Sequence, residues 1–483
     1  MNIVDEFGRN HERVVGATNP PRVMFSDNHP VASRSAATRV GTLRSMTWKY
    51  LALLVALAFG GVALAHDMIP APAQTRPIAL RGATIHTMAG APIENGTIVF
   101  DAGKIVALGA DVQIPSGTQL IEATGKHIYP GLIASNTRLG LVETNAVKAT
   151  VDFQEHGDHN PNVRAERAIN PDSEQIPVTR TNGVALAMAR PFGLLAGQGA
   201  VIRLDGWTYE EMTLQPRAAM FMDWPRSDFW SPPWLPPKRK EEFKKKRAKR
   251  LKELDAFVEK AKAYHQAKKA AEAGGKSPEF DPRLEAMGAL LRGEQPIWIT
   301  ANRADQIHEA LDFTARHGLK MVLVGGDQAM TAVEILEARD IPVVLQRINA
   351  LPVRRDDTYD EAFTLPNRLR EAGIRFCIAV TSRMGNTRNL AYEAAAAVPF
   401  GLPEDEALKA VTLYPAQIMG IADRVGSLEK GKDATLIVAD GNILEIPTQV
   451  EHMFIEGRAI DLDNRHRQLY RKYKTKYDRI KGE

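Results

Sequence analysis

The sequence predicts an α/β fold: a (β/α)8, TIM-like barrel flanked by a small composite β-sandwich. Between residues 129 and 425, short apolar segments alternate with amphipathic ones, as where 297–302 is followed by 305–317. Alternation over this length implies parallel strands, which close most economically as a barrel. Residues 76–128 and 426–462 instead carry short runs of strand character between Gly, Pro and Asn turns, which predict the two halves of the sandwich.

Each element is predicted from its own pattern. β-branched or alternating segments bounded by turn residues indicate strands, and apolar residues three or four apart indicate helices. The predicted sandwich strands are 78–88, 96–100, 104–108, 119–122, 435–438 and 450–456. The predicted barrel strands after the first are 184–190, 200–204, 297–302, 321–324, 342–346 and 375–381, with helices at 305–317 and 329–339.

The composition excludes several kinds of site. The 483 residues, 44% of them hydrophobic, suffice for one large domain and a smaller one. The formal net charge is only +4, and much of the basic excess lies in residues 238–252, so we expect no nucleic-acid partner. The single cysteine, Cys377, excludes an intramolecular disulfide and a cysteine-based zinc site. Its apolar surroundings predict a buried core residue.

The first 65 residues are interpreted as an N-terminal extension that ends in a signal peptide. An apolar run over residues 50–64 follows basic residues and ends in an Ala-Leu-Ala pattern, which is typical of a cleavage site. The run is shorter than the about twenty residues that span a membrane. We expect cleavage after Ala65 and a secreted or periplasmic protein, with an uncleaved inner-membrane anchor as the alternative. Met46 is an alternative start, which would place residues 1–45 outside the natural protein.

Three segments carry a family resemblance. Residues 129–140 read Tyr-Pro-Gly-Leu-Ile-Ala-Ser-Asn-Thr-Arg-Leu-Gly, residues 426–440 read GSLEKGKDATLIVAD, and a further match runs over 393–416. They resemble the amidohydrolase superfamily, in the branch around imidazolonepropionase, and the resemblance extends over residues 76–470. It implies a sandwich built from both ends of the mature chain. It also implies hydrolysis of carbon–nitrogen bonds in cyclic amides or dipeptide-like molecules.

The resemblance also locates the positions at which the family binds a zinc-like metal. In members, histidines on strands one, five and six and an aspartate on strand eight hold the ion, which activates water. Here those positions hold other residues: Asn136 and Arg138, Thr300 and Asn302, Val324-Gly325-Gly326, and Ser382 or its neighbour Thr381. Amide and hydroxyl oxygens are weak zinc ligands and a guanidinium is none. We therefore expect a degenerate metal site and no cofactor.

Relocated ligands are one alternative. Asp152, Glu155, His156, Asp158 and His159 follow the first barrel strand within one short segment. Such a cluster could bind a cation. It lies, however, in a Gly/Asn/Pro-rich stretch, which also suits a solvated loop or one that lines the barrel mouth.

Arginines near strand ends suggest a different site. Arg138, Arg303 and Arg383 stand at or just after predicted barrel strands, and Arg388 follows closely. Guanidinium groups bind carboxylates and phosphates without a metal. The alternative is that each pairs with a local acid or points to solvent. The predicted ligand-binding residues, from the positions that match the family site, are Asn136, Arg138, Thr300, Asn302, Ser382 and Arg383.

An insertion at residues 224–290 and a charged tail at 463–483 add to the predicted barrel. The insertion holds tryptophans among prolines and then a basic segment, with one narrow apolar stripe over 241–273. This pattern predicts a surface helix that packs on the barrel or contacts another subunit. Its functional interpretation is a lid or partner arm, and the alternative is a solvated decoration.

Three functional hypotheses follow. The protein is a hydrolase of carbon–nitrogen bonds with an altered metal site, an inactive homologue that binds a small anionic ligand, or the partner subunit of an intact relative. A homo-oligomer or a hetero-complex fits each of them, and membrane contact is expected only through an uncleaved signal anchor. The fold alone does not decide among these hypotheses, because chemistry depends on the site.

Overall fold

The computed structural model describes residues 69–227, 234, 236–352, 354–355, 357–380 and 384–482. The chain divides into two compact units, residues 1–64 and 65–483, and the fold described below is that of the second unit. The predicted signal peptide and its alternatives lie outside the described residues. Within the described part of the chain, no helix is long and apolar enough to cross a membrane.

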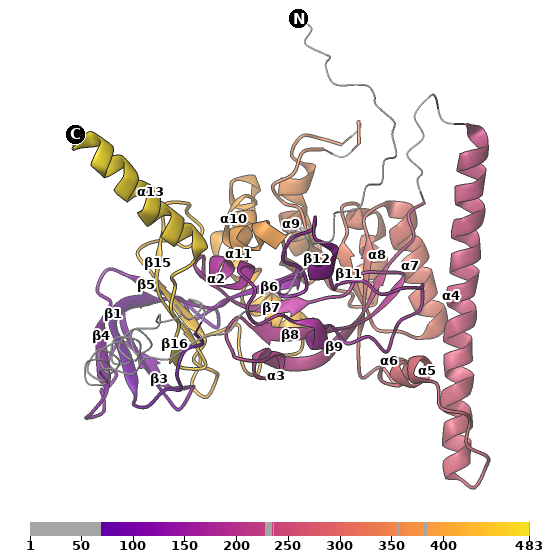
Figure 1. The fold of residues 1–483 in the computed structure, drawn as a ribbon, viewed down its shortest axis with the longest axis horizontal. Helices are drawn as coiled ribbons and strands as arrows, with labels where there is room; N and C mark the ends of the chain where they lie inside the picture. The colour runs from indigo at the N-terminus through magenta and orange to yellow at the C-terminus, as the bar shows by residue number, and fades with distance from the viewer. Residues whose placement is uncertain are drawn as a thin grey trace, which may run out of the picture. The chain divides into compact units, whose positions relative to one another are not determined.

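One eight-stranded sheet joins the two ends of the described chain (Figure 1). Antiparallel pairing of β14 with β5 places Leu436 opposite Pro130, and Phe100 packs edge-on against Phe454 in the core of this sheet. The composite domain predicted from the sequence is therefore formed. Its strands are β1 (Ile78–Ile85), β2 (Ile93–Asp101), β3 (Lys104–Gly109), β4 (Gln119–Glu122), β5 (His127–Pro130), β14 (Leu436–Ala439), β15 (Val450–Ile455) and β16 (Arg458–Ala459).

The second sheet curls into a nearly closed barrel. The amides of Ile133 on the first strand and Ile378 on the last donate to the carbonyls of Val411 and Ala410, so the chain at 410–411 bridges the two sheet edges. The predicted TIM-like barrel is confirmed. Its strands, in sheet order, are β6 (Leu132–Thr137), β7 (Val184–Ala189), β8 (Leu195–Arg203), β9 (Thr213–Asp223), β10 (Ile297–Ala301), β11 (Met321–Gly325), β12 (Val343–Leu345) and β13 (Phe376–Ile378).

One strand departs from the predicted parallel order. β8 runs antiparallel to both β7 and β9. The β7–β8 connection spans only residues 190–194, whereas a parallel crossover takes about a dozen residues or more. The expectation of a strand–helix repeat was therefore wrong at this point. The glycine-rich segment 193–199 largely belongs to β8.

Helices cover the outside of the barrel. In α7 (Ala304–His317), Ile307, Ala310 and Leu311 face the core, and Gly318 ends the helix in the left-handed conformation. The remaining helices around the barrel are α2 (Gln175–Arg180), α3 (Tyr209–Met212), α8 (Val333–Ala338), α9 (Glu361–Glu371), α10 (Leu390–Ala395), α11 (Glu404–Lys409) and α12 (Leu413–Ile418).

The insertion between β9 and β10 is helical. It comprises α4 (Pro237–Glu272), α5 (Pro282–Ala286) and α6 (Gly288–Leu291), and α4 is the long helix at the edge of Figure 1. Its narrow apolar stripe is buried against the rest of the unit through Leu254, Val258, Ala261 and Tyr264. The prediction of a packed surface helix is confirmed over this stripe. The chain ends in α13 (Arg465–Lys481).

Candidate functional site

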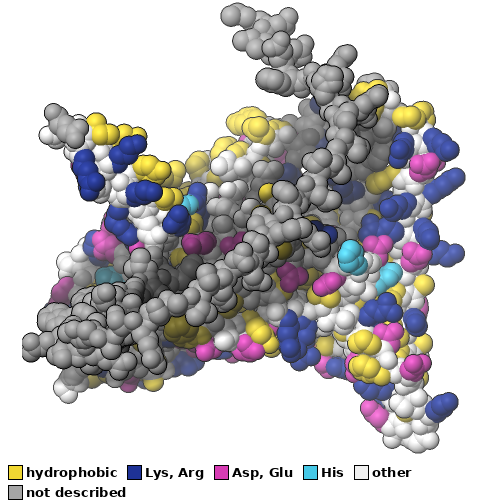
Figure 2. Space-filling view, viewed as in Figure 1, with side chains coloured by type: hydrophobic (Ala, Val, Ile, Leu, Met, Phe, Trp, Pro, Cys, Tyr) yellow, Lys and Arg dark blue, Asp and Glu magenta, His cyan; other side chains and the backbone are white. Residues whose placement is uncertain are grey.

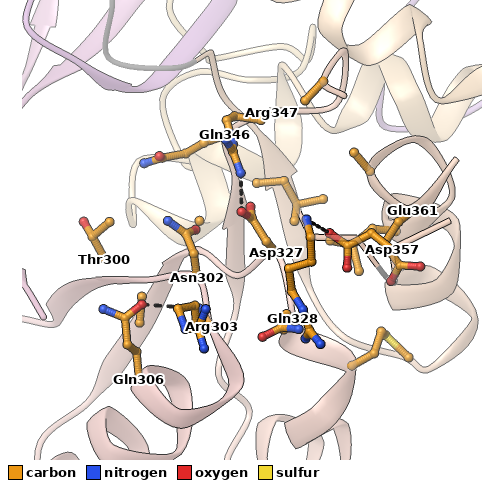
Figure 3. A pocket seen from close by; sticks show the side chains of 18 of the residues that line it. Thr300, Asn302, Arg303, Gln306, Asp327, Gln328, Gln346, Arg347, Asp357 and Glu361 are labelled. Atoms are coloured by element: carbon orange, nitrogen blue, oxygen red, sulfur yellow. Dashed lines mark hydrogen bonds and ion pairs between the residues drawn. The ribbon is translucent and has the colours of Figure 1, made fainter. Parts of the chain in front are cut away.

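A cleft of about 850 Å³ opens where β9, β10, β11 and β12 end. The carboxyl ends of barrel strands are where this fold places its functional side chains. Figure 3 shows Thr300 and Asn302 on one side of the cleft and Asp357 and Glu361 on the other, with Asp327 between them. The described lining residues thus come from the strand ends and from the segment that leads into α9.

The loops after β10 and β11 are tied to each other. The amides of Gly326 and Gln328 donate to the carbonyls of Ala301 and Asn302, each at 2.9 Å. The Asn302 side chain packs so closely on Gly325 that a Cβ there would lie 2.0 Å from its Oδ1. Gly325 is therefore required both by its φ of +91° and by this contact. The floor of the cleft is held in place before any ligand arrives.

Asp327 and Arg347 form an ion pair within the cleft (Figure 3). Burial raises the pKa of the Asp327 carboxyl and nearby Asp357 raises it further, whereas Arg347 acts in the opposite direction. A cleft carboxyl with a raised pKa is a candidate for proton transfer. The next loop is fixed behind this pair, because the amides of Ile348 and Asn349 donate to the Glu393 carboxylate, each at 3.0 Å.

The cleft carries more cations than anions. Its described lining includes five arginines against four carboxylates. Glu361 pairs with Arg368 at 2.7 Å, so part of this charge is already balanced. The arginines are Arg226, Arg303, Arg347, Arg354 and Arg368, and the acids are Asp223, Asp327, Asp357 and Glu361.

A second charged group lies at the ends of β7, β9 and β10. Arg190 donates from Nη1 to the Thr300 hydroxyl at 2.9 Å and from Nη2 to Asp223 at 2.5 Å. The other oxygen of Asp223 accepts from the amide of Gly193 at 2.9 Å. The Arg190 side chain is 1% exposed. The hydroxyl of Thr300, one of the predicted ligand-binding residues, therefore already accepts a hydrogen bond from Arg190.

Phe192 connects this group to Arg138. The guanidinium carbons of Arg138 and Arg190 lie 4.1 and 4.3 Å from the centre of its ring, and Arg138 also lies 4.0 Å from the centre of Phe153. Cations over aromatic faces are stabilised by the ring quadrupole. Burial, and next the charge of Arg190, lower the pKa of the Arg138 guanidinium, whereas Asp223 raises it.

The structure brings only part of the predicted site together. Thr300, Asn302 and Arg303 line the cleft. Arg138 does not line it but packs on Phe192, which does. Asn136 is buried in β6, with no hydrogen-bond partner found for its side-chain amide among the described residues. Arg388 contacts His466 at 3.1 Å instead of lining the cleft. Ser382 and Arg383, like Thr381, lie outside the described residues.

The acidic and histidine cluster after β6 is dispersed into separate contacts. Asp158 accepts two hydrogen bonds from Arg250 of α4, each at 2.7 Å. His159 stacks on Phe257 of α4, with ring centres 4.8 Å apart, and burial lowers its pKa. Asp152 and Glu155 line a separate hollow of about 330 Å³. In the described ranges, no three His, Cys, Asp or Glu residues are placed to hold a metal, and this includes His156.

The described residues at the family's metal positions do not fit a divalent cation. Arg138, at one of these positions, and Arg190 next to it place two guanidinium groups over Phe192. The Asp223 carboxylate at the end of β9 already forms an ion pair with Arg190. The β11 position is glycine. A divalent ion would meet like charge and few anionic ligands there.

Sequence reasoning missed Arg190, Phe192 and Asp223. Their signal was available, because Arg190 directly follows β7 and Asp223 is the last residue of β9. Charged residues at the carboxyl ends of barrel strands point toward the site. The predicted strand 184–190 ends on Arg190, but no strand was predicted over 213–223, so Asp223 was not recognised as the end of a barrel strand.

Comparisons with known proteins agree with this architecture. The sequence model of the Amidohydrolase family matches residues 260–460. Amidohydrolase tasK of Hapsidospora irregularis is 21% identical over 396 residues, which are 76% of this chain and 39% of that protein. The chain thus spans about two fifths of the length of this curated relative.

Solved structures share the fold. An amidohydrolase from Thermotoga maritima MSB8 superposes with a TM-score of 0.71 at 25% identity, over 80% of this chain and 99% of that one. A prolidase complexed with N-methylphosphonate-L-proline gives a TM-score of 0.50 at 14% identity over the same shares, a likeness of fold alone. The family match, these likenesses and the barrel with its added sheet make the chain similar in sequence and in fold to proteins of the amidohydrolase superfamily.

Proposed function

We propose that this protein binds a small molecule with a carboxylate and an amide-like group in the cleft over β10, β11 and β12. We further propose that it does so without metal-dependent hydrolysis of a carbon–nitrogen bond. The observation that carries the proposal is the packing of two guanidinium groups, Arg138 and Arg190, over Phe192. Arg138 stands at a position where the superfamily resemblance implies a metal ligand, and Arg190 packs on the same ring.

Fixed positive charge supports an anionic ligand. Two guanidinium groups face one carboxylate around Phe192, and the cleft adds an excess of arginine. In a partly buried site such charge acts more strongly than in water, and it attracts an anion along the cleft. Arginine is suited to this role because its planar fork matches a carboxylate.

Polar side chains support an amide-like group on the same ligand. Thr300, Asn302, Gln328 and Gln346 line the cleft beside apolar residues such as Leu345. Hydroxyl and amide side chains both donate and accept hydrogen bonds, as the two ends of an amide require. A concave site that places polar groups beside apolar side chains is typical of small-molecule binding.

Calorimetric titration tests the proposal. The probes are N-acetyl-L-proline, its carboxamide and N-methylphosphonate-L-proline. We expect the two anionic probes to bind and the neutral carboxamide to bind at least about tenfold more weakly. Arg138→Ala should abolish binding of the anionic probes, because it removes buried positive charge near the cleft. Arg388→Ala is the matched control, since Arg388 contacts His466 and, unlike Arg138, is not one of the cations over Phe192, and it should bind as the wild type does.

Three outcomes would contradict the proposal. Unchanged affinity in Arg138→Ala would rule out the charge argument. About one metal ion per chain by mass spectrometry, lost on substitution of His156 or His159, would instead support hydrolysis through relocated ligands. If none of the probes binds and a related protein co-purifies, the partner-subunit hypothesis is favoured.

Asp327 supports metal-independent hydrolysis as a second candidate. Its carboxyl has a raised pKa and lies in the cleft, so it could take a proton from an attacking water. Chromatography of each titrated mixture distinguishes the two functions. Cleavage of N-acetyl-L-proline by the wild type and not by Asp327→Asn would indicate hydrolysis, and intact probe in both would indicate binding alone.

A further inference from the structure

The C-terminal helix α13 extends away from the rest of the second unit. Figure 1 shows it projecting from the body, and none of its residues is buried. Figure 2 shows basic and hydrophobic side chains side by side along this helix. A helix of 17 residues with no buried residue gains little from packing, and its composition therefore calls for another explanation.

The base of α13 is firmly attached. Asn464 is buried, and its side-chain oxygen accepts from the amides of His466 and Arg467 at 2.9 and 3.1 Å. Its side-chain amide donates to the hydroxyl of Thr181 at 2.5 Å. Asp463 then binds Arg471 of the second turn through two hydrogen bonds, at 2.8 and 2.6 Å. The helix is held by its first turns at a defined origin, while its later turns face outward.

One face of α13 is aromatic and exposed. Tyr470, Tyr473, Tyr477 and Ile480 recur at spacings of three and four, which places them on a single stripe of the helix. Their side chains are 68%, 50%, 58% and 55% exposed. Tyrosine combines an apolar ring with a polar hydroxyl, a combination suited to the boundary between hydrocarbon and water.

The rest of α13 is strongly basic. Its 17 residues contain eight Lys or Arg and one acid, Asp478. These cations flank the tyrosine stripe on both sides, as helical spacing from Lys472, Lys474 and Lys476 shows. A basic polar face beside an aromatic stripe is the pattern of a helix that lies in a membrane interface.

We propose that α13 binds the surface of a membrane rich in anionic phospholipids. The cations would contact the headgroups while the stripe of Tyr470, Tyr473, Tyr477 and Ile480 enters the boundary region. The helix would lie in the interface and not cross it, because charged side chains occupy most of its circumference. This contact belongs to the folded unit and is distinct from the apolar segment at residues 50–64.

The charge on α13 makes a second copy of this chain an unfavourable partner for the tyrosine stripe. Pairing two α13 helices along their stripes would bring together sixteen cations, from the eight on each helix, against two acids. Like charges at this density oppose association. Anionic headgroups supply the complementary charge and an apolar layer in one surface, and each nearby cation strengthens the attraction.

Vesicle co-sedimentation of the full chain tests the proposal. The probes are vesicles of phosphatidylcholine alone and of phosphatidylcholine mixed with phosphatidylglycerol. We expect binding to the mixed vesicles that weakens as salt rises. Lys472→Glu with Lys476→Glu should weaken it at least about tenfold, since each cation near the surface contributes. Tyr473→Ser with Tyr477→Ser should weaken it by about an order of magnitude while the charge stays the same.

The basic helix α4 offers a matched control. Lys240→Glu with Lys245→Glu makes the same change of charge at exposed positions, on a helix whose apolar stripe is buried. This variant should bind as the wild type does. All variants keep residues 50–64, so a difference among them reports on α13. The proposal is overturned if both lysine pairs weaken binding equally, or if the wild type binds neutral and anionic vesicles equally. It is also overturned if the wild type is a dimer in solution and the tyrosine variant is not.

Discussion

Single residues decide the chemistry of the barrel centre. Arg190 is buried and pairs with Asp223, while its other amino group holds Thr300. A buried pair is weak evidence for stability, but the loss of one partner leaves an uncompensated charge. Arg190 thus supplies positive charge near the cleft, and its burial is stable only because Asp223 neutralises that charge.

Removal of Arg190 should destabilise the protein strongly. We expect Arg190→Ala to lower the free energy of unfolding by about 3–5 kcal/mol, because the Asp223 carboxylate loses its partner in a mostly buried site. Denaturant titration measures the change. Arg190→Ala with Asp223→Ala should be less destabilised than the sum of the two single variants. A strictly additive double variant would show that the two residues do not depend on each other.

His86 should make the small domain sensitive to acid. Its Nε2 lies 3.0 Å from Nδ1 of His127, and its ring stacks on Tyr129 with centres 4.3 Å apart. Burial, and then the charge of His127, lower the pKa of His86 to about 4, against the opposing effect of Glu94. The unfolded chain therefore binds more protons between about pH 6.5 and pH 4, so stability falls as pH falls through this window.

The size of this effect is bounded by the pKa shift. At most about 3 kcal/mol should be lost between pH 7 and pH 4, as measured by denaturant titration at each pH. His86→Phe keeps a ring against Tyr129 and removes the titrating group, so its stability should vary less with pH. An identical pH dependence in that variant would assign the effect to other groups.

At the scale of elements, close approach between strands shapes the barrel. Gly199 in β8 faces Phe221 of β9, and a Cβ on Gly199 would lie 2.3 Å from the ring and 2.8 Å from the carbonyl of Ala189. An antiparallel strand therefore fits between β7 and β9 only with a residue that has no side chain at this point. Gly197 and Gly199 belong to β8, whereas Gly193 lies in the 190–194 connection and donates its amide to Asp223.

Gly199→Ala should separate these strands. We expect it to lower the free energy of unfolding by about 1–3 kcal/mol, because the ring and a backbone carbonyl must both shift. Gly90→Ala is the control, since nothing lies within 4 Å of a Cβ at that position. Thermal unfolding compares the two variants. Equal midpoints would show that the Phe221 ring relaxes without cost.

At the scale of the whole molecule, sequence predicted the architecture better than the site. The barrel and the sheet from both chain ends followed from periodicity and from three family segments. The direction of β8 did not follow, because a single strand pattern does not record its partner's direction. Arg190 and Phe192 lie in the connection after β7 and Asp223 at the end of β9, and only the register of β7, β8 and β9 brings them together.

The division of the whole chain bears on export, which we propose occurs after cleavage behind Ala65. The second compact unit begins at residue 65, so cleavage there would leave it essentially whole. We expect a chain that begins at His66 to unfold at the same temperature as the full chain, because it keeps every described residue, the first of which is residue 69. Mass spectrometry of the protein expressed in a Gram-negative host would locate the new amino terminus. An intact residue 1–65 segment, or a lower unfolding temperature of the shortened chain, would contradict this division of roles.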